Sequence, residues 1–299
     1  MKWLGVALLP LIIVTARPVQ GQTDLASAPD WQTAAGGTMA FEVASVREDK
    51  GALKPPSFAL SSDAWFQEPN GRFHADFALP TYIQFAYKLR LTPEERRAML
   101  AKLPQWVGTD RFDIEATAPL HATKDQYRLM MQALLAERFG LKLHFEKREL
   151  PVVEMVLAKP GKPGPKLTAH ALGQSCDEKP KPETWPKECY SYAGMFTKDG
   201  MWRSGSRATS MDLVADFVGS SAGADPEMGR RVVDQTGLTG LWDFTLETAP
   251  AAPTAPQDGV PAGQTLIEAI QDQLGIKLKP ARAVVSVMVI DHLERPSEN

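Results

Sequence analysis

Two aspartates, Asp113 and Asp243, occupy the same position in two similar segments, residues 111–119 and 241–250. In both segments an aromatic residue precedes the aspartate, an apolar residue follows it, and the segment closes with Thr-Ala-Pro. Two carboxylates that meet in one cleft could act as a general acid and a general base. Repeated residues also mark repeated structure, such as a turn or an edge contact. The sequence therefore favours a structural role for the two aspartates, or a place on a contact surface.

Residues 219–223 read Gly-Ser-Ser-Ala-Gly and match the G-x-S-x-G pattern, in which Ser221 would be the nucleophile of a hydrolase. That motif requires a strand before the serine and a helix after it. Here Leu213, Val214 and Phe217 precede the serine at helical spacing. We therefore expect a helix that ends at Gly219 and no nucleophile elbow.

The histidines offer little metal chemistry. The chain has five of them, His74, His121, His144, His170 and His292. No pair of histidines has the ligand spacing of a helical metal site. His74 and Asp76 point to one face of a strand and could contact a metal, although a solvated strand face is the favoured interpretation. Residues 234–237 resemble an aspartic-protease loop with one extra glutamine, and we expect a tight turn at 236–240.

The N-terminus has the pattern of a secretory signal peptide. A basic start at Lys2 precedes an apolar run of residues 4–14 that is too short to span a bilayer. We expect a signal peptide at residues 1–21, cleaved after Ala16 or Gly21, and a disordered lead-in at residues 22–38. The chain is therefore expected to be exported, to the periplasm or the medium, without stable membrane insertion.

Removal of the predicted signal peptide reduces the 33 basic residues by Lys2 and Arg17, which leaves 31 against 36 acidic residues. A mildly acidic chain lacks the basic surface that nucleic acid requires, so we expect no nucleic-acid partner.

The chain has two cysteines, Cys176 and Cys189. In an exported protein such a pair is most simply a disulfide that closes a small loop. A loop of this size stabilises the fold by roughly 3 kcal/mol. The alternative is a metal site that includes His170, but zinc prefers four closely spaced ligands and only three candidates lie here. The disulfide is the favoured prediction, and we expect no cofactor.

Tryptophans occur in or beside the predicted loops, at Trp65, Trp106, Trp185 and Trp202. Exposed aromatic side chains can form a binding platform. They can equally cover the edges of a core, with Trp106 starting a strand and Trp202 in the corresponding place of the second segment. We regard Trp106, Trp185 and Trp202, with the two aspartates, as a possible contact surface.

The two repeated segments are each followed by an amphipathic helix with the same start and stop signals. Residues 123–126 and 265–268 each form a capping box, and Gly140 and Gly275 end the two helices. A unit that occurs twice indicates duplicated architecture. We therefore predict an α+β fold of two similar, duplicated units, each with helices packed on a small mixed sheet.

The expected organisation follows from this repeat. It consists of a first unit at residues 39–160, an insert rich in proline and glycine at 161–200 with the cysteine pair, and a second unit at 201–299. Within the first unit, residues 141–145 and 152–157 are expected to form a strand pair. The last strand is expected at residues 284–290. A second loop, at residues 251–263, is rich in proline and alanine.

Several short motifs occur together in a distinctive order. They are residues 41–46 (Phe-Glu-Val-Ala-Ser-Val), 111–114 (Arg-Phe-Asp-Ile), 134–139 (Leu-Leu-Ala-Glu-Arg-Phe), 233–238 (Val-Asp-Gln-Thr-Gly-Leu) and the ending Pro-Ser-Glu-Asn. Over residues 39–299 the chain resembles a large uncharacterised family of exported proteins from soil acidobacteria. Similar domains follow membrane metallopeptidases of the beta-lactam-sensor type. The resemblance implies an envelope location and a sensing or docking role, and it supplies no catalytic residues.

These observations favour a non-enzymatic binding or interaction module in the periplasm or the medium. Its expected partner is an envelope protein or a cell-surface ligand, and its expected contact surface is the groove between the two units together with the cysteine loop. Two alternatives remain open. One is an envelope hydrolase that uses Asp113 and Asp243, or Ser221, and the other is an accessory domain of a membrane signalling system.

Overall fold

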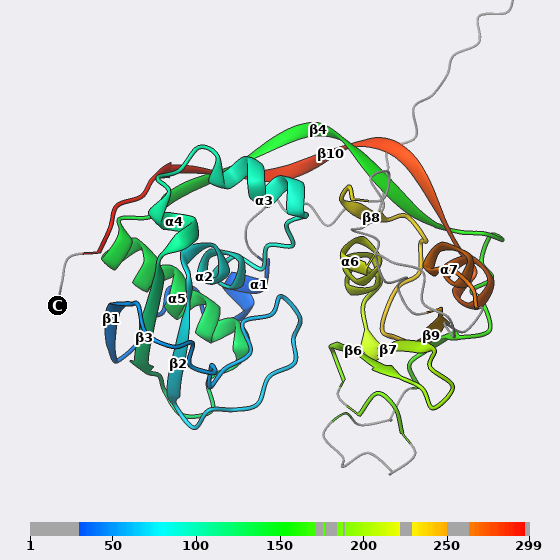
Figure 1. Ribbon diagram of the computed structural model, residues 1–299, viewed down its shortest axis with the longest axis horizontal. Coiled ribbons are helices and arrows are strands. Elements are labelled where there is room, and N and C mark those ends of the chain that lie inside the picture. Colours follow the sequence, from blue (N-terminus) through cyan, green and yellow to red (C-terminus); the bar gives the residue numbers. More distant parts are fainter. Residues whose placement is uncertain are drawn as a thin grey trace, which may run out of the picture.

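The computed structural model describes residues 30–171, 176, 184–187, 189–221, 229–249 and 263–296. The predicted signal peptide and most of the loop at 251–263 lie outside these residues. The described chain forms two lobes, and a long two-stranded ribbon joins them along one side (Figure 1). No helix among the described residues is long and apolar enough to cross a membrane.

The first lobe is a three-stranded antiparallel sheet with helices packed on one face. Its strands, in the order β1-β3-β2, are β1 (Val43–Asp49), β3 (Arg111–Thr117) and β2 (Arg72–Ala78). Along β3, Phe112, Ile114 and Ala116 are buried while the alternate residues are not, as expected for a sheet with one core face. The helices of this lobe are α1 (Asp30–Ala34), α2 (Leu79–Ala86), α3 (Pro93–Leu100), α4 (Trp106–Thr109) and α5 (Lys124–Phe139).

The second lobe is a four-stranded antiparallel sheet. Its strands, in the order β5-β9-β7-β6, are β5 (Leu167–Ala169), β9 (Trp242–Thr248), β7 (Trp202–Thr209) and β6 (Tyr192–Phe196). Helices α6 (Met211–Ser221) and α7 (Leu266–Leu274) supply the rest of its core. Phe217 of α6 packs on Phe244 of β9 with ring centroids 5.3 Å apart. In both lobes helical chain separates two neighbouring strands of the sheet, with α2 to α4 between β2 and β3 and α6 between β7 and β9, and one further helix follows, α5 or α7.

The ribbon consists of β4 (Lys142–Leu157) and β10 (Ile276–His292), with the short β8 (Val232–Asp234) beside β4. Each long strand starts in its own lobe and ends in the other. Met155, near the end of β4, belongs to the second core, whereas Met288, near the end of β10, belongs to the first. Each lobe therefore completes its core with a strand from the other lobe.

The predicted start and stop signals of both amphipathic helices are confirmed. Thr123 and Thr265 cap α5 and α7 through complete capping boxes, each accepting a hydrogen bond from the backbone N–H three residues later. Gly140 and Gly275 end the helices in the left-handed region, with φ of 58° and 69°. Glycine suits these positions because it lacks a Cβ that would clash there.

Several details of the sequence prediction were wrong. The lead-in contains helix α1, whose Gln32 bonds to Gln132 of α5. Among the described residues, the named strands of each lobe pair only antiparallel, so the predicted mixed sheets are absent there. The parallel pairings are that of β4 with β8 and an isolated bridge between Cys189 and Arg207. Residues 141–145 and 152–157 do not form a hairpin but belong to one long strand, because the intervening residues lack a turn signal such as Asn-Gly. The last strand begins at Ile276, ahead of the predicted 284–290.

Candidate functional site

Asp113 lies on the face of the first sheet that points away from its helices, where the loop at residues 50–57 covers it. Its Oδ1 is 2.9 Å from Nε2 of His74, and Lys54 of the covering loop forms an ion pair with its other oxygen. The neighbouring Asp76 is completely buried and lies 3.4 Å from Arg111. The expectation of a solvated strand face at His74 and Asp76 was therefore wrong, because sequence periodicity does not reveal that a loop covers the strand.

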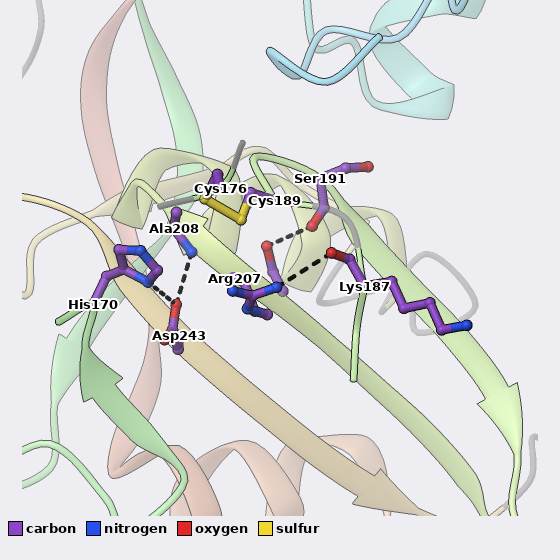
Figure 2. Close-up of a disulfide and its surroundings, with 9 residues drawn as sticks. His170, Cys176, Lys187, Cys189, Ser191, Arg207, Ala208 and Asp243 are labelled. Atoms are coloured by element: carbon purple, nitrogen blue, oxygen red, sulfur yellow. Dashed lines mark hydrogen bonds and ion pairs between the residues drawn. A yellow bond between two sulfur atoms is a disulfide. The ribbon is translucent and has the colours of Figure 1, made fainter. Parts of the chain in front are cut away.

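Asp243 contacts a histidine as well, but in the second lobe. Its Oδ1 is 2.7 Å from Nδ1 of His170 and accepts a hydrogen bond of 2.7 Å from the backbone N–H of Ala208 (Figure 2). Ala208 has a φ of 49°, at the register shift between β7 and β9. Asp243 thus stabilises a β-bulge. Asp113 and Asp243 lie on separate sheets in separate lobes, so they do not share a cleft (Figure 1).

The predicted disulfide is present between Cys176 and Cys189, with the Cα atoms 5.9 Å apart (Figure 2). The alternative metal site with His170 is excluded at these residues, because the sulfur atoms bond each other and His170 contacts Asp243. Among the described residues, no group of three or more histidine, cysteine, aspartate or glutamate side chains could hold a metal ion. The cysteine loop is fixed to β7, since Arg207 donates to the carbonyl of Lys187 over 3.2 Å, and Ser206 donates to the carbonyl of Ser191, just after the loop, over 2.6 Å.

Ser221 is the last residue of α6, so the serine lies within a helix and not on a strand-to-helix turn. Its neighbour Ser220 donates a hydrogen bond to the carbonyl of Phe217, one turn earlier. The prediction of a preceding helix is confirmed, although the helix continues past Gly219. Residues 222 and 223 of the motif lie outside the described residues.

The three tryptophans do not form one surface. Trp106 lies at the start of α4, not of a strand, and packs edge-on against Phe112 in the first lobe. Trp202 contacts Phe196 in the second lobe with ring centroids 4.9 Å apart. Trp185 of the cysteine loop lies on Gly205, where an added Cβ would approach its ring to 2.7 Å. The tryptophans therefore pack on individual structural elements.

Two pockets lie where the lobes meet. The smaller, of about 200 Å³, is bounded by Trp65 of the first lobe and by Pro186 and Tyr192 of the second. The larger, of about 220 Å³, has walls from residues 62–64 and α5 on one side and from the start of α6 on the other. The larger pocket is called the interlobe pocket below. Direct contacts join the two lobes: Ser191 donates to Asp63 of the pocket wall over 3.0 Å, and elsewhere Arg231 pairs with Glu95 over 2.8 Å.

Two buried cations on α5 organise the first-lobe wall of the interlobe pocket. Nζ of Lys124 donates to Ser61 Oγ, Asp63 Oδ1 and the carbonyl of Trp65 over 2.7 to 2.9 Å. One turn later Arg128 donates to the carbonyls of Ser61 and Asp63. Their side chains are only 3% and 1% exposed. Together they hold residues 61–65 in place at the boundary between the lobes.

Sequence reasoning missed these two cations. Lys124 and Arg128 lie on the same helical stripe as the core residues Tyr127, Met131 and Leu135. A charged residue within an apolar stripe was the available signal, because burial of a charge is costly unless partners surround it. Those partners come from a loop about sixty residues earlier in the chain, which periodicity cannot identify.

The fold and the site define a two-lobed α+β protein with a cationic pocket between its lobes. The family described as "Protein of unknown function (DUF3738)" matches residues 80–293, so the chain belongs to that family. Comparisons with curated proteins and with solved structures gave no match. The match begins after β1 and β2, although these two strands complete the first sheet.

Proposed function

We propose that this protein is an exported, non-enzymatic binding module whose ligand occupies the groove between the lobes. The observation that carries the proposal is the position of the two pockets, since both take their walls from both lobes and adjoin the cysteine loop. Concave sites between domains are a preferred location for ligands. The disulfide supports an oxidising compartment.

The groove can be blocked from one side with little risk to the fold. Ala64 lines the interlobe pocket and is exposed, so Ala64→Trp places a large ring in the pocket mouth. Ala52→Trp makes the same change at an exposed position of the loop over Asp113 and is the matched control. Both variants and the wild type, as residues 22–299, are exposed to envelope extract, and the bound molecules are identified by mass spectrometry.

We expect a ligand that the wild type and Ala52→Trp retain and that Ala64→Trp loses. Equal retention by Ala64→Trp would place the binding surface elsewhere and contradict the proposal. Turnover of any substrate that one point mutation abolishes would contradict its non-enzymatic part.

The alternative functions now have unequal support. A hydrolase that uses Asp113 and Asp243 together lacks a common cleft, and Ser221 lies in a helix. An accessory role in a membrane signalling system is compatible with the proposed binding function, since an interlobe ligand would be the signal. The test of this role is to delete the cognate membrane protein and ask whether the cellular effect of the present protein is lost.

We propose in addition that the two lobes arose by duplication. The support is the register of the ribbon, in which Glu149 of β4 pairs with Val284 of β10. Each of these residues lies nine positions after the glycine that ends the preceding helix, Gly140 or Gly275. The pairing is thus centred on equivalent positions. A chain of residues 39–160 with Glu149→Val, which avoids like charges at the centre, is expected to form a symmetric dimer through β4. A folded monomer in light scattering would contradict this.

A further inference from the structure

The lining of the interlobe pocket is strongly cationic. Its charged residues are Lys88, Arg90, Arg128 and Asp63. The single carboxylate already has partners on both oxygens, because Oδ1 accepts from Lys124 and Oδ2 accepts from Ser191, over 2.8 Å and 3.0 Å. Its charge is therefore held by groups other than the three lining cations.

The three cations have few anionic partners of their own. Lys88 and Arg128 both bond to one carboxylate, that of Asp125. Arg90 donates to the backbone carbonyl of Asp212 over 2.8 Å, and its Nε lies 3.8 Å from Asp216. Nε of Arg128 is buried and has no hydrogen-bond partner in the described part of the chain. The wall of the pocket thus contains a buried guanidinium donor that lacks an acceptor among the described residues.

Burial and the repulsion between neighbouring cations both disfavour the charged form of the lysines in this cluster, against the attraction of Asp63 and Asp125. Burial lowers the pKa of Lys124 to about 8, and the positive charge of Arg128 lowers it as well. Burial is also the main cause of the lowered pKa of Lys88, with further contributions from Arg128 and Arg90. Across the pocket, burial raises the pKa of Asp212 and Asp216, which disfavours their negative charge. A bound anion would relieve this repulsion.

We propose that the interlobe pocket binds a small anion with the chemistry of a phosphate or a carboxylate. Lys88 and Arg90, which are 28% and 31% exposed, contact the anion at the mouth, and Arg128, at 1%, forms the base. The volume of about 220 Å³ lies below the range of about 300–1,000 Å³ that drug-sized ligands need. The pocket accordingly accepts a small anion or the charged end of a longer molecule. This inference rests on the proposed binding function.

The test is isothermal titration calorimetry on residues 22–299 with inorganic phosphate and with succinate, at constant ionic strength set by sodium chloride. The variant Lys88→Gln/Arg90→Gln removes two charges at the mouth and leaves the buried Arg128 in place. The variant Arg148→Gln/Arg282→Gln removes two charges from the exposed ribbon and is the matched control.

We expect saturable binding of one anion per chain by the wild type and the ribbon variant, and binding at least tenfold weaker in the mouth variant, since hydrogen bonds to charged groups are the strong ones. Whichever probe binds more tightly identifies the phosphate or the carboxylate class. Equal weakening in both variants, or no saturable binding of either probe, would overturn the inference. A neutral ligand that Ala64→Trp excludes would overturn it too while leaving the proposed function intact, and absence of any groove-dependent ligand would overturn both.

Discussion

Helices α5 and α7 have the same start and stop signals but bury different side chains. Both start at a threonine capping box and stop at a left-handed glycine. The first and fifth residues after the capping threonine are Lys124 and Arg128 in α5, but Leu266 and Ile270 in α7. Ile270 is fully buried and Leu266 packs against the second core. The shared start and stop signals therefore do not require cations at these positions, and the two cations of α5 hold residues 61–65 at the boundary between the lobes.

The largest difference in stability between the two lobes is expected when β10 of the shared ribbon is truncated. A chain that ends after Ala283 keeps the half of β10 that packs on the second lobe and loses Met288 and Ile290 from the first core. Because one large apolar residue alone is worth about 2–5 kcal/mol, we expect the first lobe to unfold. Hydrogen exchange should show unprotected β1 to β3 and protected β7 and β9.

The control for this truncation is a chain that ends after Pro296, which keeps all of β10. It should exchange like the full chain. Retained protection of β1 to β3 in the Ala283 truncation would show that the first lobe does not depend on the exchanged strand.

The next largest difference is expected between substitutions at the corresponding buried positions of α5 and α7, measured as the loss of unfolding free energy. Arg128→Met removes the cation that donates to the carbonyls of Ser61 and Asp63, and it leaves Asp125 with Lys88 as its remaining partner. A hydrogen bond to a charged group contributes about 1.5–3 kcal/mol, and Arg128 makes two such bonds to the carbonyls. Ile270→Met at the corresponding position of α7 should cost less than about 1.5 kcal/mol, since it conserves volume and polarity. Urea unfolding measures both, and equal losses would remove the distinction between the helices.

Alkaline pH should reveal the cost of burying Lys124. Its pKa is lowered from 10.5 to about 8, mainly by burial. Between these two pH values the unfolded chain binds more protons than the folded chain, so the free energy of unfolding contributed by this residue rises with pH. Relative to Lys124→Met, the wild type should thus gain stability from about pH 8 to pH 10.5. A difference between the two proteins that stays constant over this range would contradict the assignment.

Removal of the capping threonine, which α5 and α7 share, should reduce the stability of both lobes by similar amounts. Thr123→Ala and Thr265→Ala each remove the side chain that accepts a hydrogen bond from the first turn of α5 or α7. Loss of an N-cap costs about 1 kcal/mol. Denaturant unfolding should give similar losses for the two variants. Thr92→Ala is a useful third variant because α3, which it caps, buries no residue, so its effect should be smaller.

Local signals were sufficient for much of the fold. Capping threonines and stop glycines depend on neighbouring residues, and each was found where the sequence placed it. The disulfide followed from the pairing of two cysteines. The ribbon could not be predicted, because an antiparallel pairing of β4 with β10 across the whole chain leaves no local signal. For the same reason the repeated aspartates were recognised, but their separation into two lobes was not.

The site itself was only partly predictable. A groove between two units was the prediction from the repeat, whereas the cations that line the interlobe pocket, Lys88, Arg90 and Arg128, come from separate parts of the sequence that no motif connects. The interlobe position of Asp63 and of Ser191 is likewise a product of the tertiary structure. A charged residue inside an apolar helical stripe thus indicates that the helix buries a charge, but it does not identify the residues that pair with that charge.

The most direct test of the groove as an anion site is the Nε–H resonance of each arginine in a ¹H–¹⁵N spectrum during a phosphate titration at constant ionic strength. Arg90 and Arg128 line the pocket, whereas Arg148 and Arg282 lie on the ribbon. Phosphate binding in the groove is expected to shift the first two resonances to saturation with a common midpoint, while the ribbon resonances stay in place. Equal, non-saturating shifts at all four arginines, or no shift at Arg90 and Arg128, would contradict it.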